Sequence, residues 1–225
     1  MAQPKIVTAK EEESLDIEVG KDLIRMNERM AAENLQLLNK HGILAIDVMG
    51  SVGAGKTALI EAMVDRLKGK RSVGMIAGDV TTTVDADRVT RHGVPSVQIN
   101  TGRECHLDAN MIRKALKELD LNALDLIFVE NVGNLICPAD YTLGCHQRLV
   151  VVSLTEGEWM IVKHPLIFKS ANVAAINKLD LERAMGVNAD KLAQDARSIN
   201  PRILIAKTSA KTGQGVEELL THLGF

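Results

Sequence analysis

The sequence predicts an α/β fold: a doubly wound, mostly parallel sheet of about seven strands with an N-terminal helical extension. Short β-rich runs alternate with helical patterns along most of the chain. Runs such as 126–129 (LIFV) and 149–152 (LVVV) are almost continuously apolar, which fits strands that helices cover on both faces. A glycine-rich loop also joins the first β-rich run to a helical segment.

The first expected element is an amphipathic helix from Ile17 to about Asn39, which His41-Gly42 ends. Apolar residues recur in it at roughly helical spacing among charged ones, at Leu23, Met26, Met30, Leu37 and Leu38. The remainder shows no internal repeat, low-complexity tract or Gly/Ser linker. We therefore expect residues 1–41 to form an extension and residues 42–225 to form one domain.

Seven strands are expected after this helix, each a short run rich in apolar and β-branched residues. They are expected at 43–49, 72–78, 94–99, 125–130, 148–154, 172–177 and 202–207. Helical patterns between these runs favour crossover connections and hence a parallel sheet. Open sheets of this kind bind ligands beyond the carboxyl ends of their strands.

The composition limits the partners of the chain. Its 27 basic and 29 acidic residues give a formal charge of −2, so no broad attraction to nucleic acid or anionic membrane is expected. Aromatic residues make up only 2%, too few for the stacking platforms of a single-strand binder. The N-terminus lacks an apolar leader, and three cysteines are an odd number for a disulfide framework. We expect a cytoplasmic protein.

The strongest motif is the phosphate loop at 50–57, GSVGAGKT, which matches G-x-x-x-x-G-K-[ST] between a predicted strand and a predicted helix. This context predicts a P-loop NTPase. Lys56 would reach the β/γ oxygens, and the Thr57 hydroxyl would ligate Mg²⁺. The residues expected to hold the phosphates are Gly50, Ser51, Val52, Gly53, Ala54, Gly55, Lys56 and Thr57. The loop leaves open whether the phosphoryl group goes to water or to a substrate.

The NKLD segment, 177–180, follows the sixth expected strand and is a candidate for base recognition. Guanine presents N1–H and N2–H₂ side by side, and the carboxylate of Asp180 can accept both. Adenine would leave this carboxylate unpaired, a mismatch that costs on the order of 10⁴ in discrimination. Asn177 would brace the loop, while the stem of Lys178 would lie over the base.

A second base-binding segment follows the last expected strand. Ser209, Ala210 and Lys211 resemble the SAK loop of GTPases, whose backbone N–H meets guanine O6. The phosphate loop, NKLD and SAK occur in this order, each directly after a strand. Together they resemble a GTPase and imply GTP as the nucleotide.

Carboxylates that follow two other strands are candidates for switch residues, which contact Mg²⁺ or the attacking water. Glu130 and Gly133 stand where signalling GTPases usually carry D-x-x-G, and the glutamate departs from that pattern towards the dimerising class of GTPase. Glu130 would hold Mg²⁺, and Gly133 would lie near the γ-phosphate. Asp79 and Asp85 both qualify as the residue that contacts Mg²⁺ or the attacking water, although such acids also cap helices. The sequence shows no obvious arginine finger, so slow intrinsic hydrolysis is expected.

With GSVGAGKT, IAGDV, NTGRECHLDA, ENVGNLICP, TEGE and NKLD in this order, the chain closely resembles the HypB family of GTPases, which help to deliver nickel to nickel-iron hydrogenase precursors. The resemblance implies a metal site of Cys105, His106 and Cys137 at the interface of a nucleotide-linked homodimer. Two thiolates and an imidazole suit Zn²⁺ or Ni²⁺. The resemblance also implies two partners, a nickel-delivery protein of the HypA type and the hydrogenase large-subunit precursor.

Other interpretations stay open at the level of the sequence. A urease-type nickel GTPase would carry Cys-Pro-His, a small-molecule kinase would not need NKLD and SAK, and a metal-binding module would not need hydrolysis. Cys105 and His106 could instead form a nucleophile with its base, or the cysteines could simply be buried. Cys145 and His146 match no metal position of the family and are expected to pack.

Overall fold

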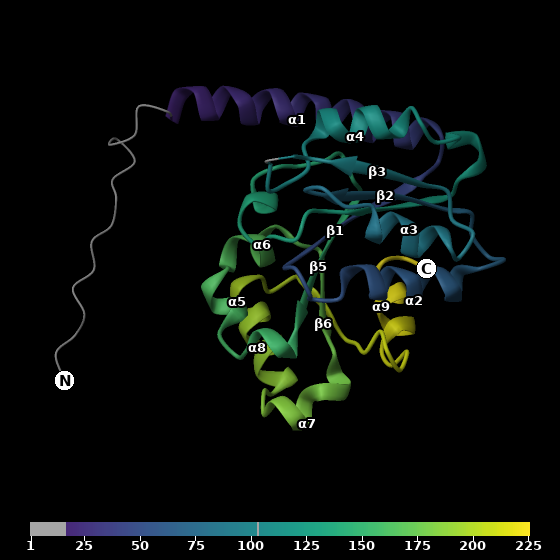
Figure 1. Cartoon of the computed structure of the whole chain (residues 1–225). Coiled ribbons are helices and arrows are strands. Elements are labelled where there is room, and N and C mark those ends of the chain that lie inside the picture. The colour runs from purple at the N-terminus through teal and green to yellow at the C-terminus, as the bar shows by residue number, and fades with distance from the viewer. Residues whose placement is uncertain (1–16, 103) are drawn as a thin grey trace.

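The computed structural model describes residues 17–102 and 104–225, so residues 1–16 of the expected extension lie outside it (Figure 1). Seven strands form one sheet in the order β3-β2-β4-β1-β5-β6-β7, and all neighbours are parallel. The strands are β1 (Leu44–Gly50), β2 (Val73–Asp79), β3 (Ser96–Asn100), β4 (Leu126–Glu130), β5 (Gln147–Ser153), β6 (Val173–Asn177) and β7 (Leu204–Lys207). The predicted fold class is confirmed.

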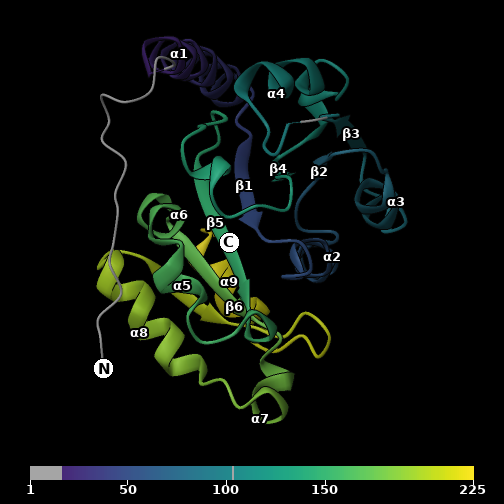
Figure 2. The same cartoon turned by 60° about the vertical axis from the view of Figure 1, so that its left-hand side comes forward.

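Helices cover both faces of the sheet (Figures 1 and 2). One face carries α2 (Lys56–Leu67), α3 (Val84–Thr90) and α9 (Val216–His222). The other carries α1 (Ile17–Lys40), α4 (Ala109–Leu116), α5 (Met160–Lys163), α6 (Pro165–Ser170) and α8 (Ala189–Ile199). The short α7 (Glu182–Met185) follows β6. Within the described ranges, no helix has the length and apolar character needed to cross a membrane.

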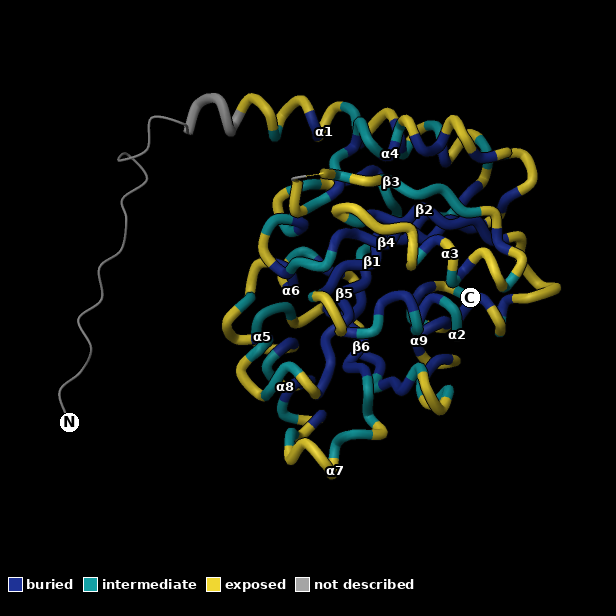
Figure 3. Tube along the Cα trace, viewed as in Figure 1, coloured by how far each residue is buried: buried dark blue, intermediate teal, exposed yellow. Residues whose placement is uncertain are grey.

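The inner strands are among the buried parts of the chain in Figure 3, and alternation of side chains along them divides the core between the two faces. In β1, Ile46 and Val48 pack under α2, whereas Ala45 and Met49 point to the opposite layer. The inner strands are buried almost throughout because helices flank them on both sides. Their carboxyl ends therefore meet at one rigid edge, from which the connecting loops emerge.

Helix α1 buries only part of the apolar stripe that its sequence predicts. Leu38 is buried, but Leu23 and Met26 are 54% and 59% exposed. Asn27 and Asn34 take the buried positions instead, and their side chains hydrogen-bond to backbone groups of Thr142, Ala109 and Leu143. Periodicity of apolar residues does not predict the burial of Asn27 and Asn34. These polar side chains are buried because their amides hydrogen-bond to backbone groups that would otherwise lack partners.

Candidate nucleotide and metal site

The phosphate loop lies where β1 passes into α2, at the carboxyl edge of the sheet. A side chain at Gly50 would not fit, since a Cβ there would lie 2.4 Å from the carbonyl oxygen of Val151. Lys56 folds back over the loop, and its Nζ donates to the carbonyl oxygens of Gly50 and Ser51, both at 3.2 Å. The ammonium group is thus held at the centre of the loop, where it can bind phosphate oxygens.

Three oxygens beside the loop form a ligand set for a hard cation. The Thr57 hydroxyl lies 2.7 Å from Asp85 Oδ1 and 2.8 Å from Glu130 Oε1. A hydroxyl has one hydrogen and can donate to only one of these carboxylates at a time. Two carboxylates and a hydroxyl fit Mg²⁺, which prefers oxygen ligands and binds together with phosphates. This convergence favours Asp85 over Asp79 as the predicted magnesium ligand.

Asp79 serves the turn that follows β2. Its Oδ1 accepts hydrogen bonds from the N–H groups of Thr81 and Thr82, at 2.9 and 2.7 Å. Burial acts to raise the pKa of Asp79, but the two backbone donors, together with the Thr82 hydroxyl and the charge of Lys56, outweigh it and the pKa is lowered. Asp79 also lines the same cavity of about 330 Å³ as Lys56 and Thr57. Its role towards the attacking water stays a prediction.

Glu130, at the end of β4, carries the most perturbed carboxylate of the cavity. Burial raises the pKa of Glu130 to about 7, although Lys56 Nζ lies 4.0 Å from its Oε1 and opposes the rise. Its second oxygen, Oε2, is buried without a hydrogen-bond partner in the described part of the chain. A buried carboxylate oxygen in this state is one that a bound cation would satisfy.

The raised pKa of Glu130 leads to a first prediction for the metal-free protein. Because the folded pKa of about 7 exceeds the ordinary 4.5, the proton contributes stability at low pH, and this contribution is lost as the pH rises through 7. By pH 8 the loss amounts to about 3 kcal/mol. Glu130→Gln should therefore gain stability relative to the unchanged protein between pH 5 and pH 8. Thermal unfolding in chelator measures this, and a constant difference would contradict it.

The two expected base-binding segments meet at the same edge. Asn177 joins them to the phosphate loop, since its Nδ2 donates to the carbonyl oxygen of Ala54 at 3.0 Å and its Oδ1 accepts from Ala210 N at 3.2 Å. The Ser209 hydroxyl donates to Asp180 Oδ1 at 2.6 Å. The exposed Asp180 carboxylate is thus oriented by the SAK segment, in which Lys211 is also exposed.

The TEGE turn links both sides of this site. Lys178 has a left-handed backbone (φ +62°), and its Nζ donates to Thr155 Oγ1 at 3.1 Å. The Ser51 hydroxyl of the phosphate loop donates to Glu156, whose other oxygen accepts from Ser153 N at 2.6 Å. In the sequence, TEGE was one of the motifs that resemble the HypB family, and its residues had no assigned role. The structure gives Thr155 and Glu156 contacts with the base and phosphate segments.

The contact between Gly55 and Asn177 leads to a second prediction. Gly55 has φ +96°, and a Cβ there would lie 2.4 Å from Asn177 Nδ2. Gly55→Ala should therefore disturb both loops and weaken nucleotide binding by at least tenfold. Gly53 is the matched control because it also has a positive φ, +80°, but a Cβ there would meet nothing within 4 Å. Nucleotide titration should show a larger loss for Gly55→Ala than for Gly53→Ala, and equal losses would contradict the prediction.

Gly133 packs directly on the phosphate loop. A Cβ at Gly133 would lie 2.4 Å from Val52 Cγ2 and 2.9 Å from Val52 N. The next residue, Asn134, donates its backbone N–H to the carbonyl oxygen of Gly50 at 3.1 Å. The segment that leaves β4 is therefore in contact with the loop that is expected to hold the phosphates, and Val52 is 84% exposed above it.

The three predicted metal ligands lie together in space, and we call them the thiolate-imidazole cluster: Cys105, His106 and Cys137. Their ligand atoms all lie within 4.8 Å of one another. The two Sγ atoms are 2.7 Å apart, and Cys105 Sγ is 3.8 Å from His106 Nδ1. The neighbouring Cys137 thiol and then burial raise the pKa of Cys105. Thiolates and imidazole suit zinc or nickel.

The remaining candidates have structural partners. Cys145 packs against the cluster of apolar residues beneath α1 and α4, and burial raises its pKa. His146 Nδ1 accepts from Ala45 N at 3.0 Å. Arg88 was not among the residues predicted from the sequence. It lines the nucleotide cavity and forms a bidentate ion pair with Glu61. Its identity as an isolated arginine in α3 gave no signal.

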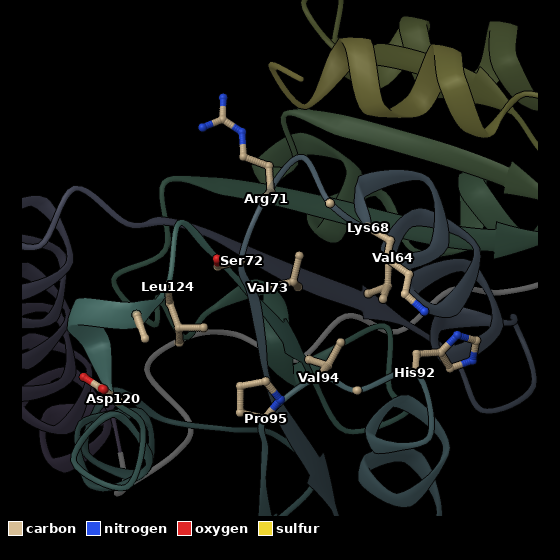
Figure 4. A pocket seen from close by; sticks show the side chains of 13 residues that line it. Val64, Lys68, Arg71, Ser72, Val73, His92, Val94, Pro95, Asp120 and Leu124 are labelled. Atoms are coloured by element: carbon tan, nitrogen blue, oxygen red, sulfur yellow. The ribbon is translucent and has the colours of Figure 1, made fainter.

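A larger cavity of about 460 Å³ lies at the opposite, amino edge of the sheet (Figure 4). Its wall includes Val73 at the start of β2, Pro95 before β3 and Leu124 before β4. Lys68, directly after α2, and His92, in the turn after α3, also line it. Open α/β sheets bind ligands at the carboxyl edge, so this cavity is not the predicted nucleotide site.

The parallel sheet and the phosphate loop between β1 and α2 define a nucleotide-binding protein of the P-loop NTPase class. Residues 44–207 match the family described as CobW/HypB/UreG, nucleotide-binding domain. A probable hydrogenase maturation factor HypB of Methanocaldococcus jannaschii is 49% identical over 207 residues, which cover 92% of this chain and 94% of that protein.

Solved structures agree with the sequence comparisons. A crystal structure of hydrogenase maturation factor HypB from Archaeoglobus fulgidus has a TM-score of 0.83 and 44% identity, covering 88% of this chain and 97% of the other. HypB from Helicobacter pylori in complex with nickel has a TM-score of 0.84 and 33% identity, covering 88% and 93%. The chain belongs to the HypB family of hydrogenase maturation factors. This result confirms the resemblance recognised in the sequence.

Proposed function

We propose that this protein is a GTP-hydrolysing metallochaperone that supplies nickel to the precursor of a nickel-iron hydrogenase. The observation that carries the proposal is the position of the thiolate-imidazole cluster. Cys137 follows Glu130 by a single short segment that packs on the phosphate loop, so one stretch of chain serves both sites. The nickel complex of the similar H. pylori protein supports nickel as the ion that is carried.

GTP is the proposed nucleotide because of the Asp180 carboxylate. It is exposed beyond the carboxyl end of β6, and Ser209 orients it, which suits the adjacent N1–H and N2–H₂ of guanine. Lys56 and the backbone N–H groups of the phosphate loop would hold the phosphates, and Thr57, Asp85 and Glu130 would hold Mg²⁺. The ion would neutralise charge on the phosphate oxygens. Asp79 or Asp85 would orient the attacking water, with slow intrinsic turnover.

Nickel is the cargo in this proposal, and zinc is a second ion that the same ligands suit. The cluster offers three ligands, so one position remains for water, for exchange or for a ligand from a second copy. We propose a homodimer that forms across this edge in the GTP state. Its partners would be a HypA-type nickel donor and the hydrogenase large-subunit precursor, all in the cytoplasm.

Equilibrium titration with GTP and ATP tests the proposed nucleotide specificity, and an assay of phosphate release tests the proposed hydrolysis. GTP should bind on the order of 10⁴-fold more tightly than ATP, and phosphate should appear without any phosphorylated acceptor. Lys56→Ala should abolish release while nickel binding to the GDP-free protein persists. A preference for ATP, or a phosphorylated acceptor, would overturn the GTPase assignment and favour a small-molecule kinase.

A further inference from the structure

We propose that Asn131, Asn134 and Arg148 are positioning residues that set the geometry of the thiolate-imidazole cluster and connect it to the phosphate loop. This inference rests on the proposed function, because it takes that cluster as the nickel site. None of the three side chains is expected to bind the ion. They hold, by hydrogen bonds, the two loops that carry the ligands.

Asn134 contacts both ligand-bearing loops and the phosphate loop. Its backbone N–H binds the Gly50 carbonyl oxygen at 3.1 Å. Its Nδ2 donates to the carbonyl oxygen of Cys105 at 3.3 Å, and its Oδ1 accepts from Ile136 N at 2.9 Å. Cys137 follows Ile136 directly, so one half-buried amide fixes the backbone at both cysteines. A shift of the phosphate loop would reach both sulfur ligands through this residue.

Asn131 holds the same loop from the buried side. Its Oδ1 accepts from Leu107 N, the residue after His106, at 3.1 Å. Its Nδ2 donates to Asp47 Oδ1 at 3.1 Å, and both side chains are almost completely buried. Asn131 also follows Glu130, the predicted magnesium ligand, in the chain. The amide therefore joins the nucleotide edge, the histidine ligand and a buried carboxylate.

Arg148 completes the network from β5. Its Nε lies 3.4 Å from Asp47 Oδ2, and its terminal nitrogens donate to the carbonyl oxygens of Pro138, Ala139 and Tyr141. These carbonyls belong to the turn that begins at Cys137. The ring of Tyr141 stacks on His106, with centroids 3.9 Å apart and an angle of 32° between the planes. Arg148 thus holds one ligand loop and, through Tyr141, the imidazole of the other.

This arrangement is more than support of the fold, because five of its bonds end at a metal ligand or within two residues of one. They are the bonds to Cys105, Leu107, Ile136, Pro138 and Ala139. Groups that orient metal ligands typically change metal affinity by 10- to 100-fold when they are removed. Arginine suits the task because its planar guanidinium can bind several carbonyl oxygens at once, whereas lysine presents a single compact ammonium group. Arg148→Lys keeps the charge opposite Asp47 and loses the bridging geometry.

The test measures nickel affinity by competition with a chromophoric chelator, together with the thiolate-to-nickel charge-transfer absorption, in the full-length protein. Asn134→Ala and Arg148→Lys should each weaken nickel binding by about 10- to 100-fold. Both should also change the charge-transfer spectrum, which a general loss of stability would not do. Asn134 is only half-buried, so its variant is expected to fold, and thermal unfolding checks this.

Asn200→Ala is the matched control, because the Asn200 amide also ties loops together, through the carbonyl oxygens of Phe168 and Ala171 at 3.1 and 2.9 Å, but none of its side-chain hydrogen bonds reaches a ligand-bearing loop. It should leave nickel affinity and spectrum unchanged. If Asn134→Ala and Arg148→Lys bind nickel like the unchanged protein while Cys105→Ser does not, the positioning role is refuted and the nickel site stands. If Cys105→Ser and Cys137→Ser bind nickel normally, the site itself is wrong and the inference falls with it.

Discussion

Asp180→Asn should lower GTP affinity on the order of 10⁴-fold, the largest effect expected of any single change in the base segments. In the proposed site the carboxylate would accept from two donors of guanine, and an amide in its place would turn one of these contacts into a clash of donors. Discrimination of this size is typical when a polar partner is left unpaired in a site built for it. Equilibrium titration with a fluorescent GTP analogue measures the loss.

The same substitution should create affinity for xanthosine triphosphate. Xanthine has an oxygen where guanine has its amino group, so the new amide can donate to that oxygen while its own oxygen accepts from N1–H. Recovery of binding with xanthosine triphosphate also shows that the variant is folded. Loss of GTP binding without this recovery would indicate damage to the loop, and unchanged GTP binding would remove Asp180 from the base site.

Cys105→Ser and Cys137→Ser should each lower nickel affinity on the order of 10²-fold or more. Each change removes one of the three ligands that this chain is proposed to supply. Zinc binding by structural cysteine and histidine sites is worth about 10 kcal/mol or more in total, so the loss of one ligand is expected to be large. Serine keeps the size of the side chain but is a poor ligand for nickel at neutral pH. Competition with a chelator gives the affinity, and metal analysis gives the stoichiometry.

Cys145→Ala is the matched control for this experiment. Cys145 is a cysteine of the same chain that packs under α1 and lies outside the thiolate-imidazole cluster. Its loss should leave nickel stoichiometry and affinity unchanged. Equal losses in all three cysteine variants would mean that nickel binds thiols without selection, which contradicts a defined site.

The strands and the main loops could be predicted because their signals are local. Each β-rich run differs from its observed strand by at most two residues at either end. The phosphate loop, NKLD and SAK are contiguous motifs, and the parallel sheet brings them to one edge. Asp79 and Asp85 could not be ranked, since only the fold shows that Asp85 reaches Thr57 while Asp79 binds its own turn.

Other features depend on contacts between distant parts of the chain. Asn27 and Asn34 look like polar interruptions of an amphipathic helix, yet they are buried because their partners lie 75 to 115 residues away. Arg148 lies in no motif, and Asn131 was noticed only as part of ENVGNLICP, without a role. Their shared partner Asp47 is 101 and 84 residues distant. Hydrogen bonds of this kind depend on tertiary structure, which apolar periodicity does not report.

The central claim is that the guanosine nucleotide controls the nickel site through the segment between Glu130 and Cys137. Nickel affinity measured with GDP and with a slowly hydrolysed GTP analogue, alongside the mass of the protein in solution, tests it most directly. We predict that the two affinities differ at least fivefold and that the analogue shifts the protein to a dimer. Equal nickel affinities and an unchanged mass in the two nucleotide states would contradict the claim.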